Sequence, residues 1–294
     1  MQSVPFEEYK KYLGRPRACL ICNTDSEGTK REVWAVDRYF KALKCQECGL
    51  ITIDPGLTEK GLQKYYQDNM GRRLDQKQKL EDRKLQYQLD NQMIEKHINK
   101  GKVLDVGCGG GFFLSALSED FNKYGIDIDE VSINYGKENY SYTFKAELIG
   151  EDSFSSNFFD LIIFRGDIEH MYDPQKALFR ATELLKKGGF LYFCATPNVD
   201  SFCAELYREK WNLWHPIQHI NHFSVKTLHN LCGKENYDIV DEDYPYLGTP
   251  YESQFDDYLK IKEDIKLMLN EDMDNINVSP PFWGNMLSLL LQKK

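Results

Sequence analysis

The sequence predicts an α/β fold with a Rossmann-like, seven-stranded sheet and a small N-terminal unit. Three observations lead to this prediction: short apolar runs alternate with helical patterns from residue 102 onward, a glycine-rich turn follows the first run, and two pairs of cysteines precede residue 50. Strands that alternate with helices form a largely parallel sheet, with helices on both faces.

Seven short segments are candidates for the strands of this sheet: residues 102–106, 123–128, 142–149, 159–164, 190–195, 237–244 and 286–293. Each is rich in apolar residues, although the segment near 142–149 is poorly defined. Helical spacing of apolar residues predicts helices between them, near 111–119, 130–140, 174–186 and 224–235. Residues 245–285 form a long insert before the last strand, and inserts of this kind are often lids.

We expect three units along the chain. Residues 1–56 surround the paired cysteines and form a zinc-ribbon unit, residues 57–99 form a helical linker or cap, and residues 100–294 form the sheet domain. The linker shows apolar residues at helical spacing, among them Leu85 and Leu89.

Composition narrows the class of protein. The 294 residues carry a formal net charge of −9, whereas general nucleic-acid binding favours a basic face. No apolar run reaches the roughly 18 residues that a membrane span needs, and the N-terminus lacks the apolar core of a signal peptide. We therefore expect a cytoplasmic protein, whose eight cysteines are thiols or metal ligands rather than disulfides.

The stretch "LDVGCGGGF", residues 104–112, predicts a ligand site between a strand and a helix. Gly107, Gly109 and Gly111 permit positive φ and leave room for a ligand beside the backbone. Asp127 follows Gly107 by 20 residues, at the end of the second strand, where a carboxylate can accept hydrogen bonds from both ribose hydroxyls. The G-x-G-x-G spacing differs from the G-x-G-x-x-G of dinucleotide sites. The alternative is a tight turn that binds no ligand.

The same stretch resembles the first motif of the class I S-adenosylmethionine (SAM) methyltransferases, and "YGIDIDE" resembles their acidic second motif. The resemblance covers roughly residues 100–294, because "FDLIIFRGDIEHMYDPQKAL", "ATELLKKGGFLYFCATPN" and "NMLSLLLQKK" resemble later strands of that fold. The features "IEH", "TPN" and "W..W.P..H...FS" are similar to ubiquinone-type O-methyltransferases and to methyltransferases of bacterial sugar and polysaccharide pathways.

The resemblance implies a binding site for SAM. The methionine part is expected on the loop, with Asp105 near its amino group and Asp127 on the ribose. Arg165, Gly166 and Asp167 are expected to border the sulfonium. The expected set is completed by the glycines and two neighbours: Gly107, Cys108, Gly109, Gly111 and Ile128. The adenine contact stays open among Glu147, Leu148 and Asp152.

The stretch "IEH" resembles the end of a Glu-x-x-Glu-His metal site that some ubiquinone O-methyltransferases have at this position. In this chain Gly166 stands three residues before Glu169, so one ligand of that set is missing. We therefore expect no catalytic magnesium. Glu169 and His170 are expected to cap the next helix and to line the pocket.

Two cysteine pairs predict a structural zinc site. Cys19 with Cys22 and Cys45 with Cys48 form two C-x₂-C pairs, with 22 residues between the pairs. Four thiolates satisfy tetrahedral Zn²⁺ and leave no position for water. The alternatives are a redox dithiol and unrelated free thiols. An N-terminal ribbon again resembles the sugar-pathway methyltransferases.

The segment "WNLWHPIQHINHFS" holds three of the six histidines of the chain. An oxygen acceptor has to lose a proton, and a base of near-neutral pKa contributes roughly 10²–10⁴-fold to the rate. We expect His219 to be that base, with His222 second and His170 third, although a histidine beside aromatic residues is often only a packing group. Trp211 and Trp214 either stack on a sugar ring or close the pocket.

The expected function is methyl transfer from SAM to a small polar acceptor, with S-adenosylhomocysteine as the product. The acceptor group is expected to be a hydroxyl of a sugar or nucleotide-sugar. One alternative is an RNA methyltransferase with a zinc ribbon, which the acidic composition disfavours. The other is a SAM-binding protein without turnover.

Overall fold

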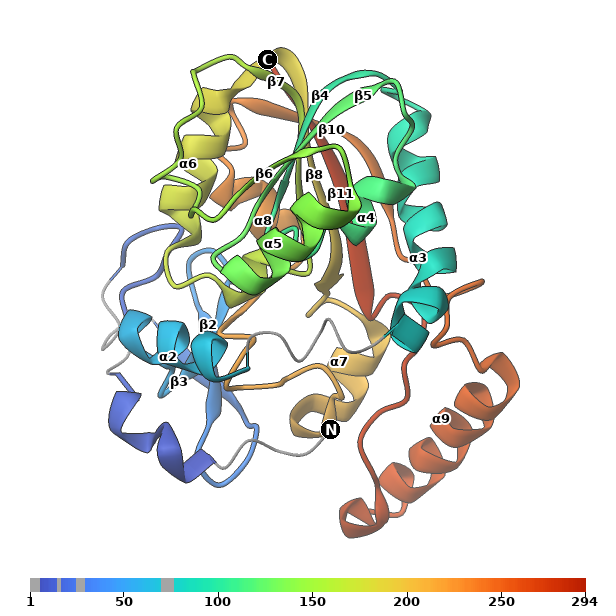
Figure 1. Ribbon diagram of the computed structural model, residues 1–294. Coiled ribbons are helices and arrows are strands. Elements are labelled where there is room, and N and C mark those ends of the chain that lie inside the picture. The colour runs from blue at the N-terminus through green and yellow to red at the C-terminus, as the bar shows by residue number, and fades with distance from the viewer. Residues whose placement is uncertain (1–5, 15–16, 25–29, 70–76) are drawn as a thin grey trace.

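The computed structural model describes residues 6–14, 17–24, 30–69 and 77–294 (Figure 1). Two sheets, one of seven strands and one of four, organise the described residues. The expected α/β fold with a seven-stranded Rossmann-like sheet is confirmed.

The larger sheet has the strand order β10-β11-β8-β7-β4-β5-β6. Neighbouring strands from β8 to β6 are parallel, whereas β11 runs antiparallel to both β8 and β10. The strands are β4 (Gly101–Val106), β5 (Phe121–Ile126), β6 (Thr143–Lys145), β7 (Phe159–Arg165), β8 (Leu185–Pro197), β10 (Tyr237–Asp243) and β11 (Met286–Lys293).

The chain alternates between this sheet and helices, which are α2 (Glu59–Asn69), α3 (Lys77–Glu95), α4 (Phe112–Ala116), α5 (Glu130–Asn139), α6 (Pro174–Leu184), α7 (Phe202–Tyr207), α8 (Val225–Leu231) and α9 (Gln254–Leu269). Five short 3₁₀ helices complete the described elements: η1 (Phe6–Glu8), η2 (Lys10–Tyr12), η3 (Ile168–His170), η4 (Arg208–Lys210) and η5 (Met273–Asn275).

Helices cover both faces of the larger sheet. Successive side chains of a strand point to opposite faces, so neighbouring residues pack against different helices. Leu104 and Ile162 pack in one buried cluster with Leu178 of α6 and Leu228 of α8. Val103, the neighbour of Leu104, belongs to a second cluster with side chains of α3, α4 and α5. This two-sided burial explains why the central strands are almost uniformly apolar.

The smaller sheet joins segments that are far apart in the sequence. Its order is β1-β2-β3-β9, with β1 (Lys30–Ala35), β2 (Lys41–Cys45), β3 (Ile51–Asp54) and β9 (Asn221–His222), all antiparallel. The backbone N–H of Ile53 donates to the carbonyl of Ile220 over 3.1 Å. The N-terminal unit therefore shares a sheet with the histidine-rich segment.

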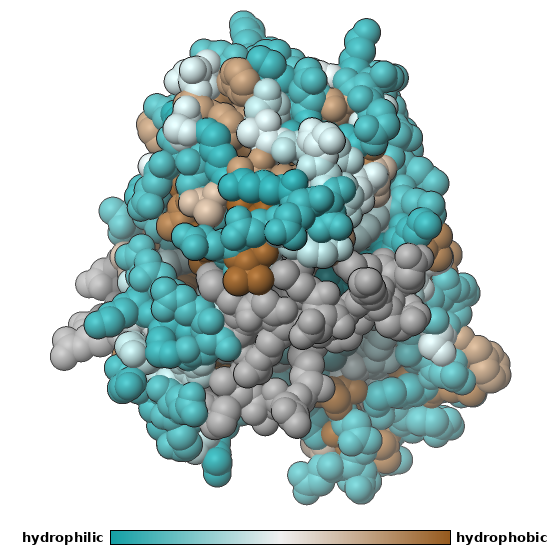
Figure 2. Space-filling model, in the orientation of Figure 1, coloured by the Kyte–Doolittle hydropathy of each residue, from teal (hydrophilic) through white to brown (hydrophobic). Residues whose placement is uncertain are grey.

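The insert at 245–285 contains α9 and η5, and α9 stands at the edge of the molecule (Figure 1). Its inner side is fixed by Asp264, which accepts a 2.6 Å hydrogen bond from Tyr207. Phe255 and Leu269 are 73% and 79% exposed, and apolar side chains over α9 are visible in Figure 2. A lid role for the insert stays a prediction.

The described residues include no helix that is both long enough and apolar enough to cross a membrane. The expected division into residues 1–56, 57–99 and 100–294 also stays a prediction. Residues 70–76, within the expected linker, lie outside the described part of the chain.

Candidate functional site

The glycine loop connects the end of β4 to the start of α4. The N–H groups of Gly107 and Cys108 both donate to the carbonyl of Ile126, at 2.9 and 3.1 Å. The φ angles of Gly107, Gly109 and Gly111 are 70°, 52° and 80°, in the left-handed region that L side chains rarely adopt. The loop is therefore held beside the end of β5 in a conformation that requires glycine.

Asp127 connects this loop to the next turn. One carboxylate oxygen accepts from the N–H of Gly109 and the other accepts from the N–H of Asp129, each over 2.8 Å. Asp127 is half-buried, and the following side chain, Ile128, is exposed. Asp127, the residue predicted to bind the ribose, thus lies at the loop, and the apolar side chain of Ile128 follows it in the sequence.

Acidic groups gather around the loop. Asp105 is buried, and its Oδ1 has no hydrogen-bond partner among the described residues. Burial raises the pKa of Asp105 to about 8; Arg165 opposes this shift, and the charges of Asp167 and Asp127 add to it. A Cβ at Gly107 would lie 2.5 Å from Oδ1 of Asp167, so Asp167 also lies against the loop. A cation bound beside these acids, such as an ammonium, would in turn stabilise the ionised form of Asp105.

Arg165 extends from the end of β7 to α3. Its Nε donates to Asp90 over 3.0 Å, and its guanidinium lies 4.5 Å from the ring centroid of Tyr87. Burial alone would lower the pKa of Arg165, but the Asp90 carboxylate raises it and keeps the guanidinium charged. Asp90 is not among the site residues predicted from the sequence; an acid among the apolar positions of α3 was the available signal.

Cys108, expected to contact the cofactor, has its side chain in the core. Its thiol is buried in the cluster that α3, α4 and α5 form on the sheet, and a Cβ on Gly125 would lie 2.6 Å from its Sγ. Only the backbone of Cys108 therefore lies along the loop.

The three candidates for the adenine contact differ in their surroundings. Asp152 accepts from the guanidinium of Arg180 over 2.8 and 3.0 Å, which assigns its carboxylate a structural role. Glu147 accepts from the N–H of Ser153 over 3.4 Å, whereas Leu148 is exposed. Leu148 is the candidate whose side chain has apolar surface to offer.

Glu169, His170 and His219 form a cluster at the end of β7. One donor atom from each side chain lies within 4.8 Å of the other two. The N–H of Ile220 donates to the carbonyl of Glu169 over 3.1 Å, so the backbone joins η3 to the loop that carries His219. Glu169 is buried and both imidazoles are half-buried.

Backbone carbonyls orient both imidazoles. Nδ1 of His170 lies 3.1 Å from the carbonyl oxygen of Gln218, and Nδ1 of His219 lies 2.9 Å from that of Leu213. Burial lowers the pKa of His219 to about 4, so this imidazole is neutral near pH 7.

His222 and the two tryptophans are core residues. The ring of His222 is fully buried, 4.7 Å from the ring centroid of Trp214, and burial holds its pKa well below the usual value. Trp211 and Trp214 are 2% and 3% exposed. Of the two alternatives for the tryptophans, stacking on a sugar ring is therefore disfavoured.

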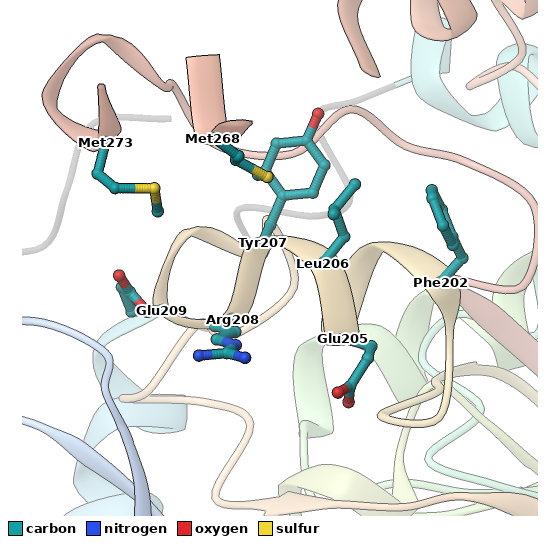
Figure 3. Close-up of a pocket in the computed structure, with 8 residues that line it drawn as sticks. All are labelled: Phe202, Glu205, Leu206, Tyr207, Arg208, Glu209, Met268 and Met273. Carbon is teal, nitrogen blue, oxygen red and sulfur yellow. The ribbon is translucent and has the colours of Figure 1, made fainter. Parts of the chain in front are cut away.

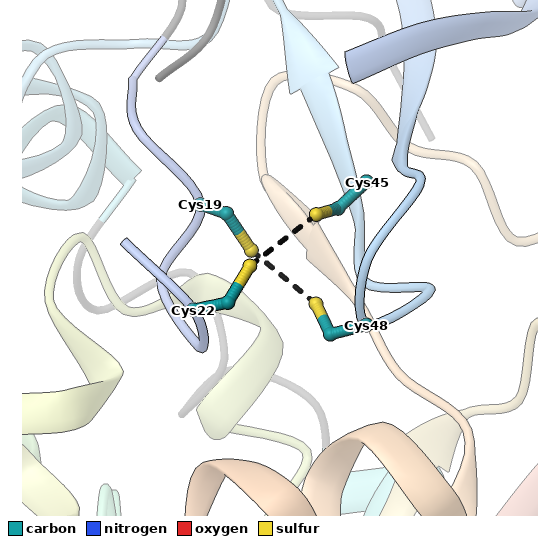
Figure 4. Close-up of side chains that lie close together, drawn as sticks. All are labelled: Cys19, Cys22, Cys45 and Cys48. Carbon is teal, nitrogen blue, oxygen red and sulfur yellow. Dashed lines mark hydrogen bonds between the residues drawn. The ribbon is translucent and has the colours of Figure 1, made fainter. Parts of the chain in front are cut away.

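The four cysteines of the two pairs converge (Figure 4). Sγ of Cys19 lies 3.3 Å from Sγ of Cys48, and Sγ of Cys22 lies 3.5 Å from Sγ of Cys45. All four sulfur atoms lie within 4.8 Å of one another. Burial acts to raise the pKa of Cys45, but hydrogen bonds from backbone N–H groups outweigh it and lower the value to about 6. The donor set suits a tetrahedral ion.

A hollow of about 460 Å³ lies between α7, η4 and the end of α9 (Figure 3). Phe202, Leu206 and Met268 supply its apolar wall, and Glu205 and Glu209 contribute charge. The residues that line it include none of the glycine loop and none of the histidine cluster. The glycine loop and the histidine cluster, rather than this hollow, therefore remain the candidate functional site.

Comparison with known proteins adds four similarities. A family model described as a methyltransferase domain matches residues 70–242, more than half of the chain. A ubiquinone biosynthesis O-methyltransferase of Shewanella sp. (strain ANA-3) is 32% identical over 172 residues, which cover 51% of this chain and 67% of that protein. A ubiquinone biosynthesis O-methyltransferase of Coxiella burnetii (strain RSA 493 / Nine Mile phase I) is 37% identical over 125 residues, which cover 39% of this chain.

The chain spans about half of the Coxiella protein, 51% of its length. Among solved structures, the chain is similar to a SAM-dependent methyltransferase of Thermotoga maritima, described as a possible histamine N-methyltransferase. That similarity has a TM-score of 0.49 and 19% identity, and covers 71% of this chain and 89% of the other.

Proposed function

Because this chain belongs to the methyltransferase domain family, we propose that it transfers a methyl group from SAM to a hydroxyl of a small polar acceptor. The observation that carries the proposal is the left-handed glycine loop, whose Gly109 N–H donates to Asp127. Oδ1 of the nearby Asp105 is buried and has no hydrogen-bond partner in the described part of the chain. The names of the O-methyltransferase relatives support an oxygen acceptor. A sugar or nucleotide-sugar is the acceptor class that we favour.

The residues around the loop fit SAM. The open backbone at Gly109 would admit the methionine part, Asp105 and Asp167 would face its ammonium, and Asp127 would accept from the ribose hydroxyls. Ile128 and Leu148 offer apolar surface to the adenine. When bound, SAM supplies an electrophilic methyl group and its own leaving group, so the chain has to align the acceptor and exclude water.

The acceptor site is proposed at Glu169, His170 and His219. These side chains lie at the carboxyl end of β7, where ligands bind in open α/β sheets. The net charge of −9 favours a small-molecule acceptor over RNA. His222, the second expected base, is sealed in the core, so His170 and His219 are the proposed contacts.

We also propose that Cys19, Cys22, Cys45 and Cys48 bind a structural Zn²⁺. Four converging sulfur atoms leave no position for a substrate. The ion would stabilise an N-terminal unit whose small sheet has a limited core of its own. A cytoplasmic location, where thiols stay reduced, is part of the same proposal.

Substitution of His219 tests this function. His219→Ala is expected to reduce methyl transfer at least about 100-fold, because it removes one of the two imidazoles proposed to position the acceptor, while SAM affinity stays unchanged. Calorimetry measures the affinity, and labelled SAM with a panel of sugars and nucleotide-sugars measures the transfer. His97→Ala is the control, because His97 pairs with Asp241 away from the cluster.

Each alternative predicts a distinct result in these assays. Wild-type protein that binds SAM tightly but methylates no acceptor would support the SAM-binding protein without turnover. Salt-sensitive RNA binding with methylation of RNA would support the RNA methyltransferase. A wild-type chain that takes up neither SAM nor S-adenosylhomocysteine would refute the proposal.

Two glycine substitutions separate ligand binding from folding. A Cβ on Gly111 would collide with Cζ of Phe144, whereas a Cβ on Gly109 would meet no atom of the described residues within 4 Å. Left-handed backbone costs an alanine about 1–2 kcal/mol in either case. Thermal unfolding should therefore show a larger loss for Gly111→Ala. Calorimetry should show that Gly109→Ala, although folded, binds SAM more weakly. Equal unfolding temperatures for the two variants would contradict this.

A further inference from the structure

We propose that Glu169, His170 and His219 hold a divalent transition-metal ion, such as Zn²⁺, Fe²⁺ or Co²⁺, beside the acceptor hydroxyl. The inference deepens the proposed function and rests on it for the identity of the acceptor site. The donor set differs from the Glu-x-x-Glu-His motif, because Gly166 has no side chain to offer as a ligand.

The first argument is the convergence of three donors from two segments. The donor atoms lie within 4.8 Å of one another. Ligands of one ion each lie about 2.0–2.2 Å from it, so ligand atoms are roughly 3–4 Å apart and the cluster has to contract by about 1 Å. The 3.1 Å backbone bond from Ile220 to Glu169 holds the two segments close enough for side-chain rotation to achieve this.

The second, independent argument is the orientation of the two rings. A carbonyl oxygen only accepts hydrogen bonds, so Nδ1 of His170 and Nδ1 of His219 carry the hydrogen in their bonds to Gln218 and Leu213. In a neutral ring of this tautomer the lone pair is on Nε2, and Nε2 of His170 lies 3.9 Å from a carboxylate oxygen of Glu169. Metal-binding histidines are oriented in the same way, with the other ring nitrogen donating to a carbonyl or carboxylate.

The third argument is the chemistry of the donor set. Magnesium prefers oxygen ligands and keeps several waters, whereas imidazole suits zinc, iron and copper. Two imidazoles and one carboxylate leave coordination positions open, as in catalytic metal sites. When bound, such an ion lowers the pKa of a hydroxyl that approaches it, and this chemistry does not require a histidine base of near-neutral pKa.

Metal counting on the full chain tests the proposal, with Co²⁺ as the probe. Metal-stripped wild-type protein, reduced and reloaded with Co²⁺, should bind two ions per chain, one of which shows the thiolate charge-transfer bands of the cysteine site. His219→Ala and the nearly isosteric Glu169→Gln should bind one ion and keep those bands. His97→Ala should bind two. Mass spectrometry of the metals gives the count, and absorption spectroscopy assigns the sites.

The readouts separate failure of this proposal from failure of the proposed function. A wild-type chain that binds only the thiolate-held ion, or a Glu169→Gln variant that still binds two, overturns the metal site. SAM binding by each variant shows that it is folded. If the wild-type chain binds two ions and methylates no acceptor, the metal site stands and the proposed function fails.

Discussion

Asp127→Ala is expected to weaken SAM binding by roughly 10²–10⁴-fold. A hydrogen bond to a charged group contributes about 1.5–3 kcal/mol, and the substitution removes two acceptors from the ribose, at about 1.4 kcal/mol for each factor of ten. In the wild-type chain the N–H groups of Gly109 and Asp129 donate to this carboxylate, and the substitution removes both hydrogen bonds. Loss of the loop geometry adds to the loss of affinity. Calorimetric titration with SAM and with S-adenosylhomocysteine measures it.

Two further variants identify the cause of that loss. Asp127→Asn keeps the size of the side chain and one acceptor oxygen, so its affinity should fall between those of wild type and Asp127→Ala. Glu138→Ala removes an exposed acid from α5 and controls for the change in net charge. Unchanged SAM affinity in Asp127→Ala would show that the carboxylate does not hold the ribose.

The strands of the larger sheet were predictable because burial on both faces requires apolar runs. The expected strand 286–293 and β11 (Met286–Lys293) coincide. Boundaries were less predictable where a helix leads directly into a strand. The helix expected to end near residue 186 ends at Leu184, because β8 begins at Leu185, which pairs with Phe159. Gly188 and Gly189, which follow this helix in the sequence, lie inside β8.

Contacts around the site were predictable where they are local in sequence. Gly109 follows β4 and Asp127 follows the neighbouring strand β5, so their contact follows from the spacing of one strand–turn–helix–strand unit. The pairing of Arg165 with Asp90 and the approach of His219 to Glu169 connect segments 50 or more residues apart. No periodic pattern encodes such contacts. Depth of burial, which lowers the pKa of His219, was equally absent from the sequence.

Replacement of both Cys45 and Cys48 by serine is expected to reduce the rate of methyl transfer at least about 100-fold and to leave SAM affinity nearly unchanged. A structural zinc contributes about 10–16 kcal/mol, more than a small sheet can replace by packing. Without the ion, β2 and β3 are expected to lose their mutual register. The residues of the proposed SAM site lie at the ends of β4, β5 and β7 in the other sheet.

The selectivity of this effect follows from the position of β9. Ile51 of β3 pairs with His222, and Ile53 donates to the carbonyl of Ile220. Ile220 in turn donates to the carbonyl of Glu169, so the N-terminal sheet holds the segment that brings His219 to η3. Loss of that sheet should therefore move His219 away from Glu169 and His170 before it affects the glycine loop.

Hydrogen exchange, SAM titration and transfer assays on the double variant measure the three consequences. Exchange should accelerate at Ile53, at Ile220 and along η3, while amides of β4 and β5 stay protected. Cys232→Ala, a buried thiol outside the cysteine cluster, is the control and should keep its zinc and its activity. A zinc-free double variant that methylates at the wild-type rate would show that the acceptor site forms without the N-terminal sheet.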